Sequence, residues 1–290
     1  MRATVTDRFH LSALGVPALW LALFVLVPFV IIAAISLGQG VDAQPPFVLA
    51  WSWENYQLLT EDALYTEAYG NALRIAATSS VIALLIGYPM AYAIATAPAR
   101  WRGMLIILVI LPFWTSFLVR IYAWMALLRP TGLINMALQG LGLIDEPLQL
   151  INNQFAVHLG IVYGYLPFMV LPLYASLEKI DRALTDAAAD LGAGPWRSFW
   201  TVTFPLSLPG VLAGFLLVFV PAVGEFVIPE LLGGPDTPMI GRVLWTEFFS
   251  NRDWPVAAAL SVSLSLLLVV PVAVLQHLLA PRTGNTGGAA

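Results

Sequence analysis

Residues 205–233 read PLSLPGVLAGFLLVFVPAVGEFVIPELLG, and this stretch decides the class of fold. Glu225 and Glu230 are its only charged side chains. A helix needs roughly 20 apolar residues to cross the hydrocarbon core of a bilayer, which is about 30 Å thick. The stretch is therefore long enough to span a membrane, and its prolines predict a helix that is not straight throughout.

Five further stretches have the same character, so the whole chain has the composition of a membrane protein. Hydrophobic residues make up 59% of the 290 positions and charged residues 10%, and the mean hydropathy is +0.83. The first stretch is too long for the apolar part of a cleaved signal peptide. The longest connecting segment, residues 38–69, is too short for a sizeable core of its own. We therefore predict an all-α membrane protein whose six transmembrane helices lie at residues 11–37, 70–97, 104–128, 155–177, 205–233 and 254–280.

The distribution of basic residues predicts which ends of the chain lie in the cytoplasm, because basic loops are retained there. Eight basic residues fall at the N-terminus, in the 2/3 and 4/5 loops and in the tail: Arg2, Arg8, Arg100, Arg102, Lys179, Arg182, Arg197 and Arg282. The loops opposite contain Arg129, Arg242 and Arg252. Both termini are thus predicted to be cytoplasmic, with a short N-terminus at residues 1–10 and a disordered tail at residues 281–290. The opposite face is acidic, and it can either gather cations or simply form solvated loops.

The sequence lacks the residues and motifs that several kinds of catalysis and binding require. It contains no cysteine, which excludes disulfides, thiolate catalysis and cysteine-ligated metals. Its single lysine, Lys179, follows Glu178, so the glycine-rich phosphate loop of an ATPase does not occur. The three histidines lack the spacing of a metal or catalytic motif. The formal charge of -4 does not suit a nucleic-acid surface. We expect no catalytic residue, metal or cofactor in this chain, no enzymatic activity and no nucleic-acid partner.

The 4/5 loop, residues 178–205, has a pattern typical of a short surface helix. Alternating charges and an alanine-rich run lead to Gly192 and Gly194, where a helix can end and turn, and then to Pro195. Such a helix either simply connects two spans or projects from the surface and docks into a depression on a partner protein.

The spacing within this loop resembles that of a known family. Asp186-Ala187-Ala188, three residues, Gly192, nine residues and then Val202-Thr203-Phe204-Pro205 resemble the EAA loop of binding-protein-dependent ABC importer permeases. Asp186, Val202 and Phe204 stand where the family usually has Glu, Ile and Leu. The resemblance implies that the loop forms a coupling helix that docks on an ATPase subunit. The residues to which it assigns this role are Asp186, Ala187, Ala188, Gly192, Val202 and Pro205.

Other parts of the chain narrow the resemblance. The stretches LPFWT (111–115), RIYAW (120–124), PAVGEFVIPELLGG (221–234), MIGRVLW (239–245) and NRDWP (251–255) look like those of the spermidine/putrescine permeases, the PotB/PotH group, and are closest to the putrescine member. This likeness covers essentially the whole chain. It implies the type I ABC importer permease fold, also called MetI-like, over residues 11–280.

The resemblance also implies partners and a function. The chain would pair with a second, homologous permease subunit, two ABC ATPase subunits that use ATP, and a periplasmic polyamine-binding protein, in the lipid of a bacterial inner membrane. Its expected function is to form half of the pathway of an ATP-driven polyamine importer. The alternatives are an ABC permease for another solute, such as a phosphonate, an opine or a metal chelate, and a stand-alone secondary carrier. The carrier would need an intramembrane proton relay, which we do not find.

Ionisable residues at membrane depth are costly, and they are therefore candidates for function. Arg120 and Glu225 lie at similar depths, since each is roughly 25 Å from the inner side at 1.5 Å per residue, when Glu225 is counted from an inner end near Pro209. We expect them to meet, either as a structural ion pair or as a site where Glu225 receives a substrate ammonium group.

Three further residues are candidates for the same pathway. Glu230 faces it together with Glu225 only if Pro229 breaks the helix, because five residues rotate an ideal helix by about 140°. Tyr122 and Trp124 can attract a cation to their ring faces, or they can belong to the aromatic belt at a membrane interface.

Overall fold

The computed structural model describes residues 15–235 and 237–279, and the chain divides into two compact units. One unit combines residues 1–63 with 244–290, as far as these are described, and the other comprises residues 64–243. The predictions made for residues 1–10 and 281–290 fall outside the described residues. Six described stretches are long and apolar enough to cross a membrane, which confirms the predicted class: Gly15–Ile35, Ala63–Thr96, Phe117–Gly140, Gln154–Leu177, Pro195–Val223 and Trp254–Val274.

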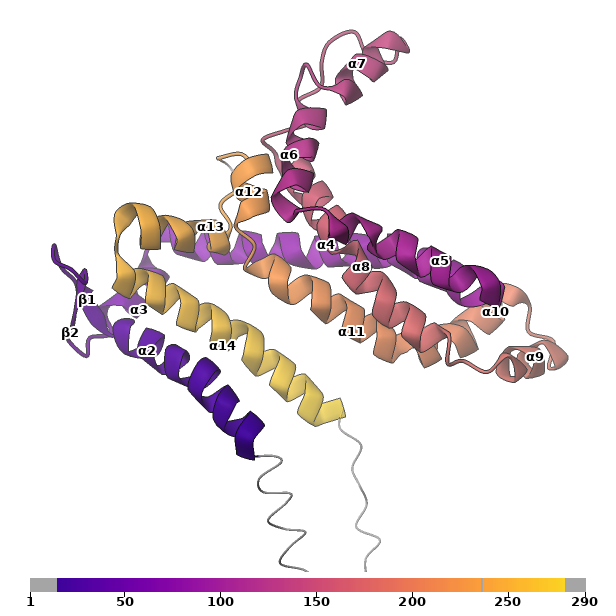
Figure 1. Ribbon diagram of the computed structural model, residues 1–290, viewed down its shortest axis with the longest axis horizontal. Coiled ribbons are helices and arrows are strands. Elements are labelled where there is room, and N and C mark those ends of the chain that lie inside the picture. Colours follow the sequence, from indigo (N-terminus) through magenta and orange to yellow (C-terminus); the bar gives the residue numbers. More distant parts are fainter. Residues whose placement is uncertain (1–14, 236, 280–290) are drawn as a thin grey trace, which may run out of the picture. The chain divides into compact units, whose positions relative to one another are not determined.

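The first unit consists of helices and a small hairpin (Figure 1). Its elements are η1 (Ala22–Leu26), α2 (Val27–Ile35), β1 (Gly38–Gly40), β2 (Phe47–Leu49), α3 (Glu54–Glu61), η4 (Thr246–Asn251) and α14 (Trp254–Leu279). α14 packs against α2 and α3, and the two strands pair antiparallel. Asn55 ties α3 to the hairpin, because its Nδ2 donates hydrogen bonds of 2.8 Å to the carbonyls of Ser36 and Gly38.

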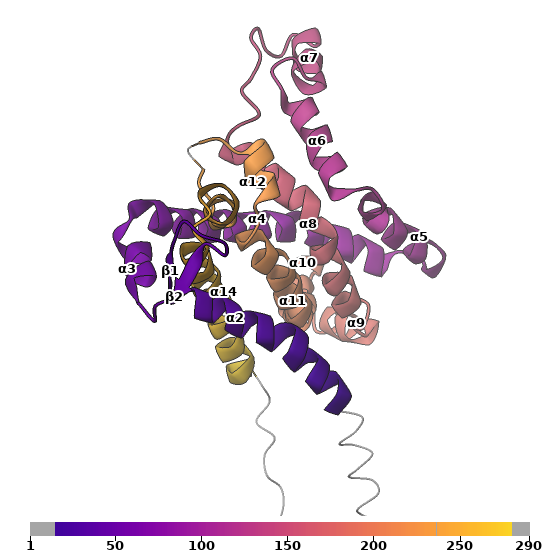
Figure 2. The same ribbon diagram turned by 60° about the vertical axis from the view of Figure 1, so that its left-hand side comes forward.

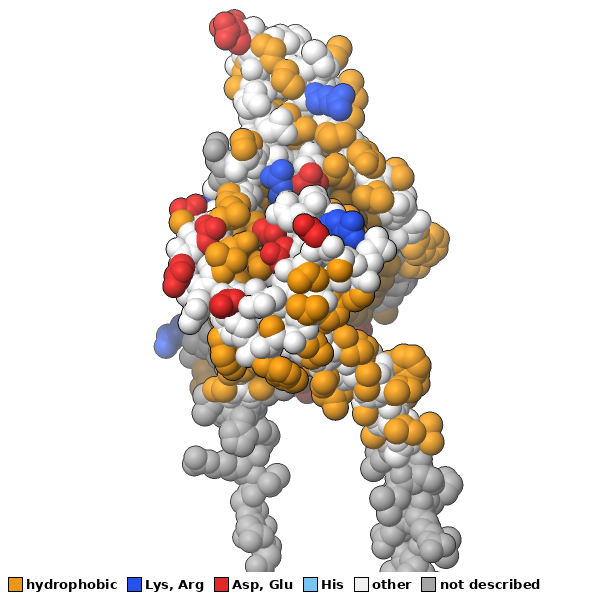
Figure 3. Space-filling view, turned by 90° about the vertical axis from the view of Figure 1, so that its left-hand side faces the viewer, with side chains coloured by type: hydrophobic (Ala, Val, Ile, Leu, Met, Phe, Trp, Pro, Cys, Tyr) orange, Lys and Arg blue, Asp and Glu red, His pale blue; other side chains and the backbone are white. Residues whose placement is uncertain are grey.

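The end of this unit that carries the hairpin is rich in acidic side chains. Figure 3 shows them interspersed with hydrophobic ones on the face that contains β1, β2 and α3. Asp42, Glu54 and Glu61 are exposed there. These residues belong to the acidic loops noted in the sequence.

The second unit contains most of the helices and both candidate functional regions. Its elements are α4 (Ala63–Thr96), α5 (Ala99–Ile110), η2 (Leu111–Trp114), α6 (Phe117–Leu128), α7 (Leu133–Gly140), α8 (Gln154–Leu177), α9 (Arg182–Asp190), α10 (Pro195–Ser198), η3 (Phe199–Thr203), α11 (Phe204–Val223), α12 (Val227–Leu232) and the start of α13 (Ile240–Trp245). Its core lies where α4, α8 and α11 meet.

Small residues allow these three helices to approach closely. Gly87 on α4 and Gly214 on α11 both face Met169 of α8, where an added Cβ would lie 3.0 Å and 2.9 Å from the Met169 side chain. Gly210 on α11 faces Ser176 of α8 in the same way. Close helix packing through small residues is the usual device in membranes, where lipid gives no hydrophobic drive for association.

The third predicted span, residues 104–128, is wrong as a single helix. α5 ends at Ile110, and the backbone at Thr115 and Ser116 is extended between η2 and α6. Pro112 contributes to this break because it has no N–H to continue the helical hydrogen bonds. The stretch that is long and apolar enough to span is Phe117–Gly140, which joins α6 to α7.

The fifth predicted span, residues 205–233, has the wrong ends. The helical stretch runs from Pro195 to Val223, and Pro205 continues it because the wide π-type turn of η3 comes directly before and makes room for the ring. The chain then leaves the helix and resumes as α12. The break therefore precedes Pro229, which lies in the first turn of α12, where proline is tolerated.

Candidate functional site

α9 is the surface helix expected in the 4/5 loop, and side-chain and backbone caps define both its ends. Asp181 begins it by accepting a hydrogen bond of 2.9 Å from an N–H of the first turn. At the other end Gly192 has φ +81°, its N–H donates to the Ala189 carbonyl, and the Ala193 N–H donates to the Ala188 carbonyl. This pair of bonds is a Schellman ending, which needs a residue in the left-handed conformation and so favours glycine.

The outer surface of this loop combines acidic and apolar groups. Asp186 and Ala187 are exposed in the middle of α9, and Ala188 is half-buried. Beyond the helix, Leu191 and Trp196 expose 90% and 73% of their surface. Leu191 lies outside the apolar spans, where a large apolar side chain this exposed suits a surface that another protein covers, and Trp196 lies at the very start of the span Pro195–Val223.

The remaining two residues of the EAA-like pattern lie where the loop returns to the bundle. Val202 is half-buried in η3, and Pro205 lies in the first turn of α11. The pattern thus extends from the exposed face of α9 to the start of the long fifth helix.

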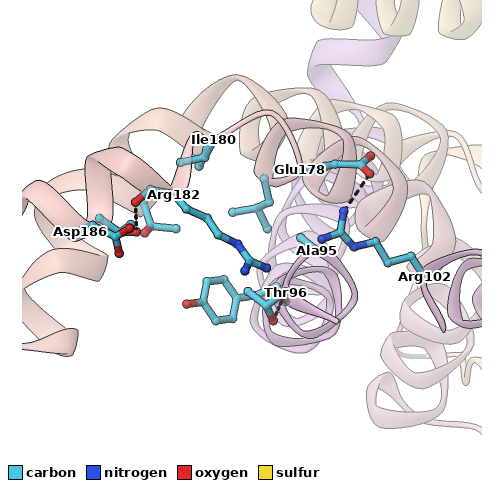
Figure 4. A pocket seen from close by; sticks show the side chains of 11 residues that line it. Ala95, Thr96, Arg102, Glu178, Ile180, Arg182 and Asp186 are labelled. Carbon is cyan, nitrogen blue, oxygen red and sulfur yellow. Dashed lines mark hydrogen bonds and ion pairs between the residues drawn. The ribbon is translucent and has the colours of Figure 1, made fainter. Parts of the chain in front are cut away.

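A pocket of about 220 Å³ lies behind α9, between it and the ends of α4, α5 and α8. Figure 4 shows Arg182 reaching from α9 toward Thr96 at the end of α4, and Arg102 turned toward Glu178. Arg102 and Glu178 form an ion pair of 3.3 Å that joins the start of α5 to the end of α8. α9 itself packs against α10 and η3.

A second, open cavity of about 580 Å³ lies among α6, α8 and the break between α11 and α12. Figures 1 and 2 both show α12 beside α6 and α8, and it packs against both. Gly160 on α8 makes room for α12, because a Cβ there would lie 2.8 Å from Ile228. Aromatic side chains dominate the cavity wall: Phe113, Phe117, Tyr165, Phe168 and Phe226.

Glu225 is the only acidic residue in the wall of this cavity as far as the structure describes it. It is 7% exposed, and it stands in the break between α11 and α12. Its Oε1 accepts hydrogen bonds from the N–H groups of Val227 and Ile228, at 3.0 and 3.4 Å, and Oε2 accepts one from the Tyr165 hydroxyl. The carboxylate is thus fixed in position by the start of α12 and by α8.

Arg120 lines the same cavity from α6 but forms no ion pair with Glu225. Its guanidinium carbon lies 4.9 Å from the ring centre of Phe113 and 5.7 Å from that of Phe117. These are distances at which aromatic rings attract a cation. The structure therefore brings the two predicted charged residues to one cavity and leaves them unpaired.

The other predicted pathway residues lie elsewhere. Glu230 forms an ion pair of 2.6 Å with Arg242 and is not part of the cavity wall. Trp124 packs edge-on against Tyr163, with 5.4 Å between ring centres, and Tyr122 is exposed on α6. None of these three lines the cavity that contains Glu225.

The hydrogen bond from Tyr165 to Glu225 is a contact that sequence reasoning did not identify. Tyr165 stands out in the sequence only as one aromatic residue of an apolar span, and its bond to Glu225 depends on how α8 and α12 pack. The contact of Phe113 with Arg120 was likewise not identifiable, because it depends on the helix break between them. Phe117 lies three positions before Arg120 on α6, a spacing at which helical side chains are neighbours, so the sequence could have shown that contact.

Comparison with known proteins gives consistent matches along the chain. Residues 4–285 match the family described as binding-protein-dependent transport system inner membrane component. The spermidine/putrescine transport system permease protein PotB of Haemophilus influenzae is 37% identical over 266 residues, which are 92% of each chain. PotB of Escherichia coli is 41% identical over 250 residues, which are 86% of this chain and 90% of the relative.

A solved structure shares the fold. The bacterial ABC transporter involved in import of the acidic polysaccharide alginate contains a chain that superposes with a TM-score of 0.68 over 95% of this chain and 96% of that one, at 19% identity. The fold expected for this family is thus confirmed. The family match over nearly the full length shows that the chain belongs to the family of binding-protein-dependent transport system inner membrane components.

Proposed function

We propose that this chain is the transmembrane permease subunit of an ATP-driven polyamine importer, and that it forms half of the translocation pathway. The observation that carries the proposal is the match to spermidine/putrescine permeases over about nine-tenths of both chains. The charged cavity between α6, α8 and α12 supplies a place for the substrate.

Glu225 and the surrounding rings suit an ammonium group. A carboxylate accepts charge-assisted hydrogen bonds from a primary ammonium. Aromatic faces such as those of Phe168 and Phe226 add cation–π attraction of roughly 0.5–2 kcal/mol each. Glu225 is therefore proposed to bind one end of a polyamine on its way through the membrane.

α9 is proposed to couple the pathway to ATP use. Its exposed Asp186 and the neighbouring Leu191 and Trp196 form the surface that an ATPase subunit would cover. Closure of two ATPase subunits would move α9, and the Arg102–Glu178 ion pair lies between the helices that carry this movement into the bundle. Such rigid-body motion about helix breaks provides alternating access to the cavity.

The proposed orientation follows from the arginines. α9 and both termini face the cytoplasm of a bacterial cell, and the acidic hairpin end faces the periplasm, where a polyamine-binding protein docks. A second permease subunit completes the pathway. No covalent chemistry takes place in this chain.

The test is to purify the chain with its associated subunits and to reconstitute the complex in vesicles. We expect labelled putrescine or spermidine to enter only when ATP, the ATPase subunits and the binding protein are present. Unlabelled polyamines should compete and an anionic phosphonate should not. Competition by the phosphonate alone would favour an anion permease, and uptake by the isolated chain without ATP would favour a stand-alone carrier.

A further inference from the structure

Within the described part of the chain, Arg120 is a buried cation with no anionic partner. Only 9% of the residue is exposed, and its Nε and Nη1 have no hydrogen-bond partner among the residues that the structure describes. The nearby rings of Phe113 and Phe117 attract its charge but accept no conventional hydrogen bond. A buried charge left in this state is costly, so an acceptor in the cavity would bind it favourably.

Glu225 offers such an acceptor, and the number of its free positions is limited. A carboxylate has about four lone-pair positions. The N–H groups of Val227 and Ile228 take two of them on Oε1, and the Tyr165 hydroxyl takes one on Oε2. One position on Oε2 therefore remains, and Glu225 lines the same cavity as Arg120.

Two cations can use this single position, one at a time. When the cavity holds no substrate, the guanidinium of Arg120 is the cation available to Glu225. When a polyamine enters, its terminal ammonium needs the same oxygen, and two like charges in one low-dielectric cavity repel each other. Occupancy by one cation therefore weakens binding of the other.

We propose that Arg120 is a resident competing cation that displaces the substrate ammonium from Glu225 and so promotes its release. This inference rests on the proposed function, since it takes a polyamine as the substrate. It also explains why a pathway for cations contains a fixed positive charge. Transport needs binding that is weak enough to reverse, and Arg120 weakens it without removing the carboxylate.

The experiment measures retention of labelled putrescine by the purified importer complex without its binding protein. Arg120→Gln keeps most of the side-chain volume and removes the charge. We expect this variant to bind putrescine about tenfold more tightly than the wild type, which corresponds to ~1.4 kcal/mol. Uptake at saturating loaded binding protein should become slower, because release is slower. Arg120→Lys, which restores a cation, should return both values toward those of the wild type.

Two controls separate this role from a structural one. The double variant Arg120→Gln/Glu225→Gln should lose the gained retention, because the acceptor is no longer charged. Arg129→Gln removes an exposed arginine from the end of the same helix and should bind putrescine like the wild type. Retention that does not increase in Arg120→Gln, or that persists in the double variant, overturns the proposal.

A second variant keeps the proposal testable if changes at Arg120 prevent assembly. Tyr165→Phe leaves Arg120 in place and frees a second position on Oε2. Putrescine and Arg120 then no longer need the same position, although their charges still repel each other. Retention should therefore rise, but less than tenfold, and unchanged retention overturns the proposal. Uptake by the wild type distinguishes failure of this inference from failure of the proposed function. If the wild type imports neither putrescine nor spermidine, the proposed function itself is wrong and the inference falls with it.

Discussion

Glu230 on α12 and Arg242 on α13 form an ion pair, with 2.6 Å between Oε2 and Nε. Glu225, five positions earlier, instead holds the start of α12 and the Tyr165 hydroxyl at the cavity wall. Two carboxylates that belong to one sequence motif therefore have different partners. One ties α12 to the helix that follows, and the other lies in the wall of the cavity.

This difference predicts unequal effects of removing the two charges. Glu225→Gln should lower polyamine uptake by about tenfold or more, because a neutral amide loses the charge-assisted bond to an ammonium group. Glu230→Gln should lower uptake by about fivefold at most, since a partly exposed ion pair contributes roughly 0–1 kcal/mol. ATP-driven uptake of labelled putrescine by equal amounts of assembled complex measures both.

Assembly with the partner subunits is the control for both variants. Equal uptake by the wild type and an assembled Glu225→Gln complex would remove Glu225 from the pathway. A larger loss in Glu230→Gln than in Glu225→Gln would place the substrate at α12 and α13 instead.

The class of fold could be predicted from sequence because membrane spans are set by length and hydropathy alone. The prediction for residues 155–177 matches α8 (Gln154–Leu177) almost to the residue. The prediction for residues 104–128 is wrong, since an apolar run says how much of a chain can enter lipid but not where its backbone leaves the helix. The break at Thr115 depends on local backbone geometry that hydropathy does not report.

The candidate site was predictable only in part, for a related reason. Arg120 and Glu225 are visible in the sequence because charges are rare at membrane depth, and counting the helical rise places them at one level. The Tyr165 bond and the Arg242 ion pair are not visible, because they depend on the direction of the chain after the break at Gly224. The end of α9 was predictable, since a left-handed residue at a helix end calls for glycine and Gly192 supplies it.

The contact of α12 with α8 predicts sensitivity at Gly160. An added Cβ would lie 2.8 Å from Cγ2 of Ile228, so Gly160→Ala should cost about 1–3 kcal/mol by overpacking. Combining it with Ile228→Ala should cost less than the sum of the two single changes, because the smaller side chain makes room. Denaturant unfolding of the purified complex in detergent measures the loss in free energy of unfolding for the two single variants and for the double variant.

Gly70 on α4 provides the matched control for this comparison of the Gly160 and Ile228 single and double variants. Nothing lies within 4 Å of a Cβ added there, so Gly70→Ala should be neutral or slightly stabilising. Strictly additive costs for Gly160 and Ile228 would contradict close packing between α8 and α12.

A buried hydrogen bond between α4 and α11 predicts a smaller effect. The Tyr88 hydroxyl lies 2.9 Å from Oγ of Ser207, which also donates to the Phe204 carbonyl. Tyr88→Phe should therefore cost only about 1 kcal/mol, because Ser207 keeps one partner. The same unfolding measurement checks this, with Tyr92→Phe as the control on the same helix. A loss several times larger would mean that Tyr88 has a further role.

The ending of α9 predicts how coupling responds to changes at Gly192. Its φ of +81° costs a residue with a side chain roughly 1–2 kcal/mol, and a β-branched residue fits this conformation worst. Gly192→Val should therefore reshape the end of α9 and lower substrate-stimulated ATPase activity several-fold. Gly192→Asn should keep most of it, because asparagine tolerates the left-handed conformation. The assay is ATP hydrolysis by the reconstituted complex with and without loaded binding protein.

Gly194 separates this geometric effect from a simple gain in side-chain volume. It has φ −65° and ψ 165°, which any residue adopts, and a Cβ there meets nothing within 4 Å. Gly194→Ala should therefore leave the stimulation unchanged. If Gly192→Val is also stimulated normally, the shape of this ending does not matter for coupling. α9 would then be an ordinary connector, and the ATPase would have to contact the chain elsewhere.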